Sequence, residues 1–80
     1  MAARLYIREW RIYHGLRTQG RTLSQEQLSA RVGRSGATIS RLERGLTDYS
    51  GKLLSALAEA LGCEEPDLFR PPPHRDLRGG

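Results

Sequence analysis

Residues 24–45 read SQEQLSARVGRSGATISRLERG, and their caps, apolar spacing and glycines are the strongest signal of fold in the 80-residue chain. It begins with a capping box, because the Ser24 side chain can accept a hydrogen bond from the backbone N–H of Gln27 while the Gln27 side chain reaches back to Ser24. Leu28 then starts an apolar side, and Gly33 is suited to end a helix. The sequence therefore predicts a short helix between Ser24 and Gly33.

A second helix is predicted after a turn of only three residues, Gly33-Arg34-Ser35. Ser35 is suited to be its N-cap, Ile39 and Leu42 form its apolar side, and Gly45 closes it. A turn this short, with glycine at the bend, sets two helices at a steep angle and leaves the second one protruding. The outward positions of the second helix contain no carboxylate; they are Gly36, Ala37, Ser40, Arg41 and Arg44.

The segment before residues 24–45 predicts another helix. Apolar residues from Leu5 to Leu16 recur at spacings that fit a helix better than a strand, and arginines are mixed among them. Two ends are open for this helix. It either stops at Gly15 or continues to Gln19 and stops at Gly20.

The segment after residues 24–45 predicts two further helices and a tail. A leucine-rich helix starts near Ser50 and ends before Gly62, and a short helix covers residues 64–69. A run of three prolines then favours an extended backbone. We expect an all-α fold of four or five short helices, with residues 1–4 a loose N-terminus, residues 5–69 one domain, and residues 70–80 a flexible tail.

The charge of the chain is concentrated in its first half. Residues 1–45 carry nine Arg against three acids, a net +6, whereas residues 46–80 carry four basic residues against six acids, a net −2. A basic half in a small chain favours a polyanion as partner, although arginine used only for solubility would give the same composition.

Composition also restricts the class of protein. The chain has no apolar run long enough to span a membrane, and its first 15 residues lack the apolar region of a signal peptide. Its only cysteine, Cys63, cannot form an internal disulfide, so we expect a cytoplasmic protein. We expect no metal at His14 or His74, because neither has Cys or His neighbours at ligand spacing. We expect no cofactor and no enzymatic activity, because no catalytic arrangement or phosphate loop is recognisable.

The 24–45 stretch resembles the helix-turn-helix of the Cro/repressor-type (xenobiotic-response-element, XRE) transcriptional regulators. Ten positions match that family's pattern at fixed spacing, and the likeness extends over roughly residues 5–70; the ten are Ser24, Gln25, Leu28, Gly33, Ser35, Ile39, Ser40, Leu42, Glu43 and Gly45. The resemblance implies a lambda-repressor-like fold and a bacterial or phage-derived regulator that binds palindromic double-stranded DNA as a homodimer.

The resemblance also assigns roles to residues. It places the recognition helix, residues 36–44, in the major groove, with base contacts from Gly36, Ala37, Thr38 and Arg41. It implies DNA backbone contacts from Gln25, Ser35, Ser40, Arg44, Lys52 and Arg11. In the same family pattern, Arg11 also pairs with Glu43.

Two departures from the family pattern leave alternatives open. Seven residues, 16–22, are inserted before the capping box, so either the first helix is longer or Arg17 and Arg21 lie on a basic loop near the DNA backbone. Gly36 and Ala37 are smaller than the family's usual residues, which favours a rival function. In that reading the same fold is a protein-binding module, an antitoxin or an adaptor, and its partner is another regulatory protein.

Residues outside the motif have simpler interpretations. Trp10 is expected in the core or at a dimer surface, and Cys63 at a half-buried helix end. Tyr49 either packs in its loop or contacts a phosphate. Leu68 and Phe69 are expected to be exposed and to supply the dimer contact.

Overall fold

The computed structural model describes residues 4–73, and these residues form four α-helices and one 3₁₀ helix with no strand. In chain order they are α1 (Ile7–Gln19), α2 (Gln25–Val32), α3 (Gly36–Glu43), α4 (Gly51–Leu61) and the 3₁₀ helix η1 (Glu65–Phe69). The all-α prediction is confirmed. Within the same residues, none of the helices combines the length and apolar character that crossing a bilayer requires.

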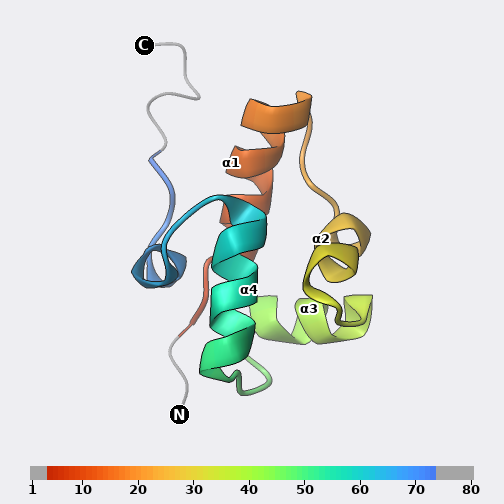
Figure 1. Ribbon diagram of the computed structural model, residues 1–80, viewed down its shortest axis with the longest axis vertical. Coiled ribbons are helices and arrows are strands. Elements are labelled where there is room, and N and C mark those ends of the chain that lie inside the picture. The colour runs from red at the N-terminus through yellow and green to blue at the C-terminus, as the bar shows by residue number, and fades with distance from the viewer. Residues whose placement is uncertain (1–3, 74–80) are drawn as a thin grey trace.

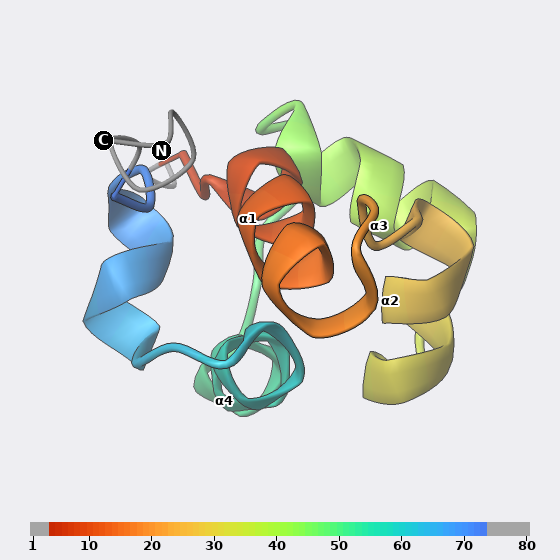
Figure 2. The same cartoon turned by 90° about the horizontal axis from the view of Figure 1, so that it is seen from above.

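The helices are arranged around one core. Figure 1 shows α1 and α4 along the long axis of the molecule, with α3 crossing at their lower end and α2 beside them. Seen from above, η1 lies on the other side of α1 and α4 from α2 and α3 (Figure 2). As a result, one side of α3 packs inward while the other faces solvent.

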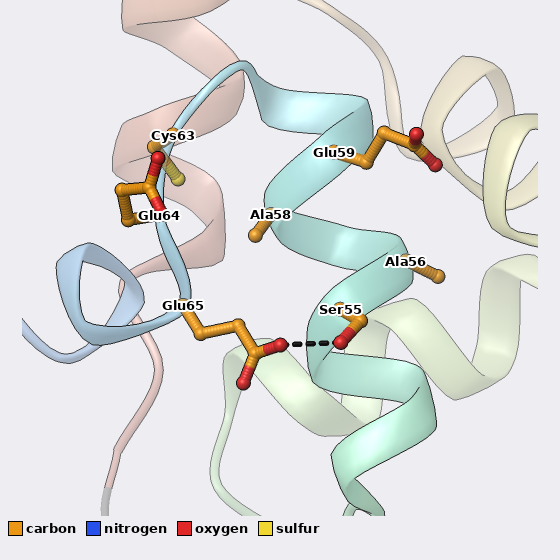
Figure 3. A pocket seen from close by; sticks show the side chains of 7 residues that line it. All are labelled: Ser55, Ala56, Ala58, Glu59, Cys63, Glu64 and Glu65. Atoms are coloured by element: carbon orange, nitrogen blue, oxygen red, sulfur yellow. Dashed lines mark hydrogen bonds between the residues drawn. The ribbon is translucent and has the colours of Figure 1, made fainter.

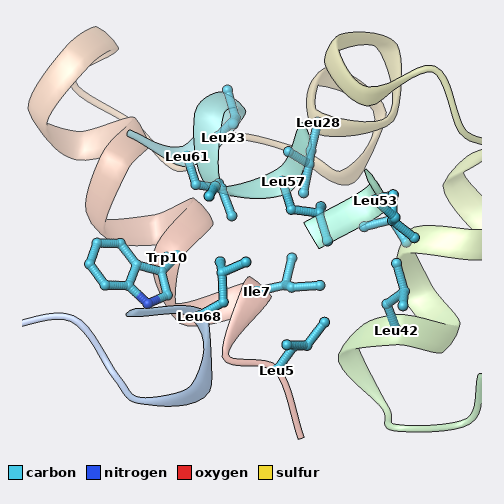
Figure 4. Packing of buried hydrophobic residues seen from close by; sticks show 12 residues of the cluster. Leu5, Ile7, Trp10, Leu23, Leu28, Leu42, Leu53, Leu57, Leu61 and Leu68 are labelled. Carbon is cyan, nitrogen blue, oxygen red and sulfur yellow. The ribbon is translucent and has the colours of Figure 1, made fainter. Parts of the chain in front are cut away.

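The core consists of side chains contributed by every helix (Figure 4). Nine of them are almost completely buried: Leu5, Ile7, Leu23, Leu28, Ile39, Leu42, Leu57, Leu61 and Leu68. Trp10 is also buried, and its indole Nε1 donates hydrogen bonds to the carbonyls of Asp67 (2.9 Å) and Arg70 (3.0 Å). This confirms the core interpretation of Trp10 and ties α1 to the segment that follows η1.

The first helix takes the longer of its two predicted forms. α1 continues past Gly15 to Gln19 and ends at Gly20, which adopts the left-handed conformation with φ of 77°. Gly15 has a different role, because a Cβ there would lie 2.2 Å from the backbone N of Leu23 and 2.4 Å from the carbonyl O of Arg21. The chain after Gly20 therefore folds back directly over α1, and only glycine leaves room for it.

The C-terminal segment differs from its prediction in two respects. The predicted exposure of Leu68 is wrong, because this residue is fully buried and its carbonyl accepts a hydrogen bond from the backbone N–H of Tyr6. The predicted flexible tail includes residues 70–73, yet Arg70 bonds Trp10 and Pro72 is buried. Residues just past the predicted domain end at residue 69 thus contact the domain, and residues 74–80 lie outside the described residues.

Candidate functional site

The turn between α2 and α3 has the geometry that its sequence predicts. The capping box forms, with the Gln27 N–H donating to Ser24 Oγ (3.0 Å) and the Ser24 N–H donating to Gln27 Oε1 (2.9 Å). Gly33 ends α2 in the left-handed conformation with φ of 70°, and Ser35 Oγ accepts the backbone N–H of Thr38 at 3.2 Å. Two capped helices thus meet at a turn whose backbone is fixed by local hydrogen bonds.

The outer face of α3 is basic and free of acids. Ile39 and Leu42 are buried, whereas Ala37, Arg41 and Arg44 are exposed. Among the described residues, neither Arg41 nor Arg44 lies within ion-pair distance of a carboxylate. Two guanidinium groups are therefore available to an external anion or hydrogen-bond acceptor.

The smaller side chains of α3 border this face. Gly36, Thr38 and Ser40 are partly buried, and the Thr38 hydroxyl lies 3.1 Å from Ser35 Oγ. A Cβ at Gly36 would meet no atom within 4 Å other than those of its chain neighbours and of its own helix backbone. The first turn of α3 thus presents little besides backbone to the exterior.

A buried ion pair anchors α3 to α1. Arg11 Nε donates to Glu43 Oε2 at 2.6 Å, and its terminal nitrogen Nη2 donates to Glu43 Oε1 at 3.1 Å. The Arg11 side chain is 9% exposed and that of Glu43 is 8% exposed, so the pair is largely shielded from water. The predicted pairing of Arg11 with Glu43 is confirmed.

The same ion pair extends to α2 and to the chain before it. Arg11 Nη1 donates to the carbonyl of Leu23 at 2.8 Å, and the carboxamide Nε2 of Gln25 donates to Glu43 Oε1 at 3.1 Å. One carboxylate therefore holds side chains from both α1 and α2. Because the Arg11 guanidinium already donates to Glu43 and Leu23 and the residue is 7% exposed, its first role is to position α3.

The remaining predicted residues divide between two regions. Lys52 is exposed in the first turn of α4, directly after the loop that leaves α3. Arg17 instead lies on α1, stacked over the ring of Tyr13 at 5.3 Å. The end of α1 and the loop containing Arg21 lie at the opposite end of the molecule from α3 (Figure 1). The structure thus separates Arg17 and Arg21 from the exposed face of α3.

One exposed arginine beside α3 is absent from the residues predicted from the sequence. Arg34, in the turn before the Ser35 N-cap, is exposed and carries a third guanidinium next to the outer face of α3. The sequence could have indicated Arg34 as a candidate, because a cation in the turn lies next to the start of the protruding helix.

A shallow hollow of about 480 Å³ lies elsewhere, between α4 and the start of η1 (Figure 3). Its lining is mostly acidic and small, and contains none of the candidate residues: Ser55, Ala56, Ala58, Glu59, Cys63, Glu64 and Glu65. Burial, and then the nearby carboxylates of Asp67 and Glu64, raise the pKa of the Cys63 thiol to about 11. Cys63 is therefore a half-buried, protonated thiol at neutral pH, in agreement with its predicted position.

Comparison with known proteins gives one match to a family model and one to a solved structure, and none to a curated protein. A family model described as helix-turn-helix matches residues 16–68. Among solved structures, the chain is similar to the DNA-binding domain of the P22 C2 repressor, with 31% identity and a TM-score of 0.61. That match covers 85% of this chain and 84% of the other. No curated protein matches the chain.

Proposed function

The chain belongs to the Cro/repressor-type helix-turn-helix family, and from this premise we propose that it is a DNA-binding regulator of transcription that recognises specific sequences in duplex DNA. The observation that carries the proposal is the outer face of α3, where exposed Arg41 and Arg44 have no carboxylate within ion-pair distance in the described chain. A helix that protrudes with such a face fits the major groove of B-DNA.

The proposed contacts follow from where each residue lies. Arg41 reads a guanine, since a guanidinium can donate two hydrogen bonds to O6 and N7, worth ~1–3 kcal/mol of discrimination. Gly36, Ala37 and Thr38 lie against neighbouring base edges, and the Ala37 methyl suits the thymine C5-methyl. The DNA backbone contacts come from exposed or partly exposed side chains around this face: Gln25, Ser35, Ser40, Arg44 and Lys52.

Arg11 contributes to DNA binding mainly by holding α3 in position. Its bonds to Glu43 and Leu23 hold α3 in place, and two of the five guanidinium N–H groups are left over for a phosphate. We assign Arg11 to positioning first and to backbone contact second.

We propose that two copies bind a palindromic operator. A dimer of such modules reads half-sites roughly 34 Å apart on one face of the duplex. Because Leu68 is buried, the dimer contact falls to the exposed apolar side chains nearby. Phe69 is 38% exposed and lies against Tyr49, with ring centroids 6.1 Å apart. Leu46, in the loop between α3 and α4, is 61% exposed.

A salt titration of DNA binding tests the proposed function. The wild-type protein should bind a mixed-sequence duplex at low salt and lose affinity steeply as salt rises, because phosphate contacts release counterions. Arg44→Ala should weaken binding to all sequences about equally. Arg17→Ala is the matched control, because that arginine is exposed at the other end of the molecule, and it should leave affinity nearly unchanged.

The second candidate function is a protein-binding module, an antitoxin or an adaptor that binds another regulatory protein. The bare first turn of α3 at Gly36 and Ala37 favours it, because a smooth surface also suits a protein partner. The same titration separates the two functions. A protein adaptor binds no duplex specifically at any salt concentration, and Arg44→Ala then changes nothing.

A further inference from the structure

Arg34 has a fixed backbone and an exposed, charged side chain. Its N–H donates to the carbonyl of Ser29 at 3.1 Å, so the turn holds the residue in place. Its guanidinium makes only a long hydrogen bond to the carbonyl of Gly33, at 3.4 Å. Within residues 4–73 no carboxylate lies within ion-pair distance of it. Nothing in the described fold explains the charge at this position.

The neighbouring Arg31 provides the contrast. It lies only three residues earlier, and its Nη1 donates to the carbonyl of Ala60 at 3.3 Å. That bond directs its charge toward the C-terminal end of α4, where a cation stabilises the helix dipole. Arg31 thus has a role inside the fold, and Arg34 does not.

The spacing between Arg34 and Arg44 matches the dimension of the groove. Nine residues lie between them, and eight of these form α3, whose axis at about 1.5 Å per residue is roughly 12 Å long. The major groove is about 12 Å wide. If α3 crosses the groove, one arginine lies just beyond each end of the helix, next to the phosphates that border the groove.

The residues between the two arginines allow this seating. Gly36, Ala37 and Ser40 are small, and a methyl group placed on Gly36 would have no atom within 4 Å other than those of its chain neighbours and of its own helix backbone. No bulky side chain from this turn holds the start of α3 away from the groove floor. Arg34 can then reach a phosphate without stretching away from the helix.

We infer that Arg34 is a phosphate contact on the DNA strand opposite the one that Arg44 binds, an assignment that rests on the proposed function. The two arginines clamp α3 across the groove, while Arg41 lies between the strands and reads bases. Arg34 thus contributes affinity that does not depend on sequence, and it sets the register of α3 on the duplex.

Salt dependence tests the contact itself. Losing one phosphate contact lowers the slope of log K against log[salt] by about 0.9. Between 50 and 200 mM salt, the affinity of Arg34→Ala should therefore change about 3- to 4-fold less than that of the wild type. Arg34→Lys should restore the slope, and Arg31→Ala should keep it. Circular dichroism melting of each variant checks that the fold is retained.

Neutralised phosphates test the strand. In duplexes where single phosphates are replaced by uncharged methylphosphonates, one replacement should weaken binding of the wild type but not of Arg34→Ala. A different replacement, on the other strand, should weaken binding of the wild type but not of Arg44→Ala.

The outcomes distinguish failure of this inference from failure of the proposed function. If the wild type binds no duplex at low salt, the proposed function fails. If the wild type binds but Arg34→Ala keeps the full slope, or both insensitive phosphates lie on one strand, the clamp is wrong and the DNA-binding function stands.

Discussion

Gly15 and Gly36 differ in the space that surrounds them. At Gly15 a side chain would collide with the backbone of the returning loop, whereas at Gly36 it would meet no atom within 4 Å other than those of its chain neighbours and of its own helix backbone. Neither residue is among the glycines with positive φ, so the difference comes from space and not from backbone conformation.

Two alanine substitutions should therefore have opposite effects on stability. Gly15→Ala should lower the free energy of unfolding by about 3 kcal/mol or more, because backbone atoms must move to admit the methyl group. Gly36→Ala should raise it by up to about 1 kcal/mol, because alanine favours the helix. Urea unfolding of both variants measures the two changes. A stable Gly15→Ala protein would contradict the close packing of the 20–24 loop on α1.

A histidine makes the fold sensitive to acid. Burial, followed by the charges of Arg31 and Arg17, lowers the pKa of His14 below its usual 6.5. The unfolded chain then binds a proton before the folded one as pH falls, so stability should decrease below about pH 6.5 and level off below the folded pKa. His14→Gln should flatten this part of the profile in thermal melts between pH 5 and 7. An unchanged slope would assign the sensitivity to other groups.

At the scale of elements, one carboxylate joins three helices. Glu43 on α3 accepts hydrogen bonds from Arg11 of α1 and Gln25 of α2, in surroundings mostly shielded from water. The orientation of α3 therefore depends on charges that lie behind its exposed face. Removing one partner leaves the other charge buried and unpaired.

Arg11→Met should lower the free energy of unfolding by about 3–5 kcal/mol, because Glu43 is left as an uncompensated buried charge. The double variant Arg11→Met with Glu43→Met should be more stable than Arg11→Met alone, because no unpaired charge remains. Chemical denaturation of the single and double variants gives the comparison. A double variant less stable than Arg11→Met would show that the unpaired Glu43 charge is not what destabilises the single variant.

The sequence predicts elements well where their signals are local. The capping box at Ser24 and the N-cap at Ser35 act over three residues, and both form as predicted. The end of α1 is ambiguous from the sequence because Gly15 and Gly20 are equally good terminators in a local pattern. Only the packing of Leu23 against α1 decides between them, and that contact depends on the folded chain.

Predictions fail where burial depends on distant contacts. Leu68 follows an acidic, proline-containing helix start that favours exposure, yet it is covered by residues near the N-terminus. The indole of Trp10 binds Arg70, which is 60 residues away, and so orders a segment that a run of prolines predicts to be free. For the candidate site, the sequence analysis identifies the face of α3 but omits Arg34. The base and backbone contacts assigned to α3 and its surroundings remain predictions.

At the scale of the whole molecule, an apolar patch accompanies the basic face. It is formed by Tyr49 of the loop after α3 and Phe69 of η1, whose ring centroids lie 6.1 Å apart. Because Tyr49 lies in the loop that leaves α3, we propose that a second copy bound here brings another α3 to the same DNA.

Phe69→Glu should convert the proposed dimer into a monomer, because a charge at the centre of an apolar contact is costly to desolvate. Analytical ultracentrifugation with an excess of palindromic duplex should then show one chain per bound duplex instead of two, because without the dimer contact the two half-sites fill independently. Leu16→Glu is the control, since that leucine is 43% exposed on α1, outside the patch. Two chains per duplex with Phe69→Glu would show that the dimer uses another surface.

Selection of bound sites from a random duplex library, run in parallel with wild type and Arg41→Ala, shows whether α3 reads DNA sequence through Arg41. We predict that the wild type enriches a palindrome whose half-sites lie about one helical turn apart. Arg41→Ala should enrich the same site with a single G·C position per half-site relaxed to any base. Failure of the wild type to enrich any sequence, or an enriched site that Arg41→Ala leaves unchanged, would contradict the account.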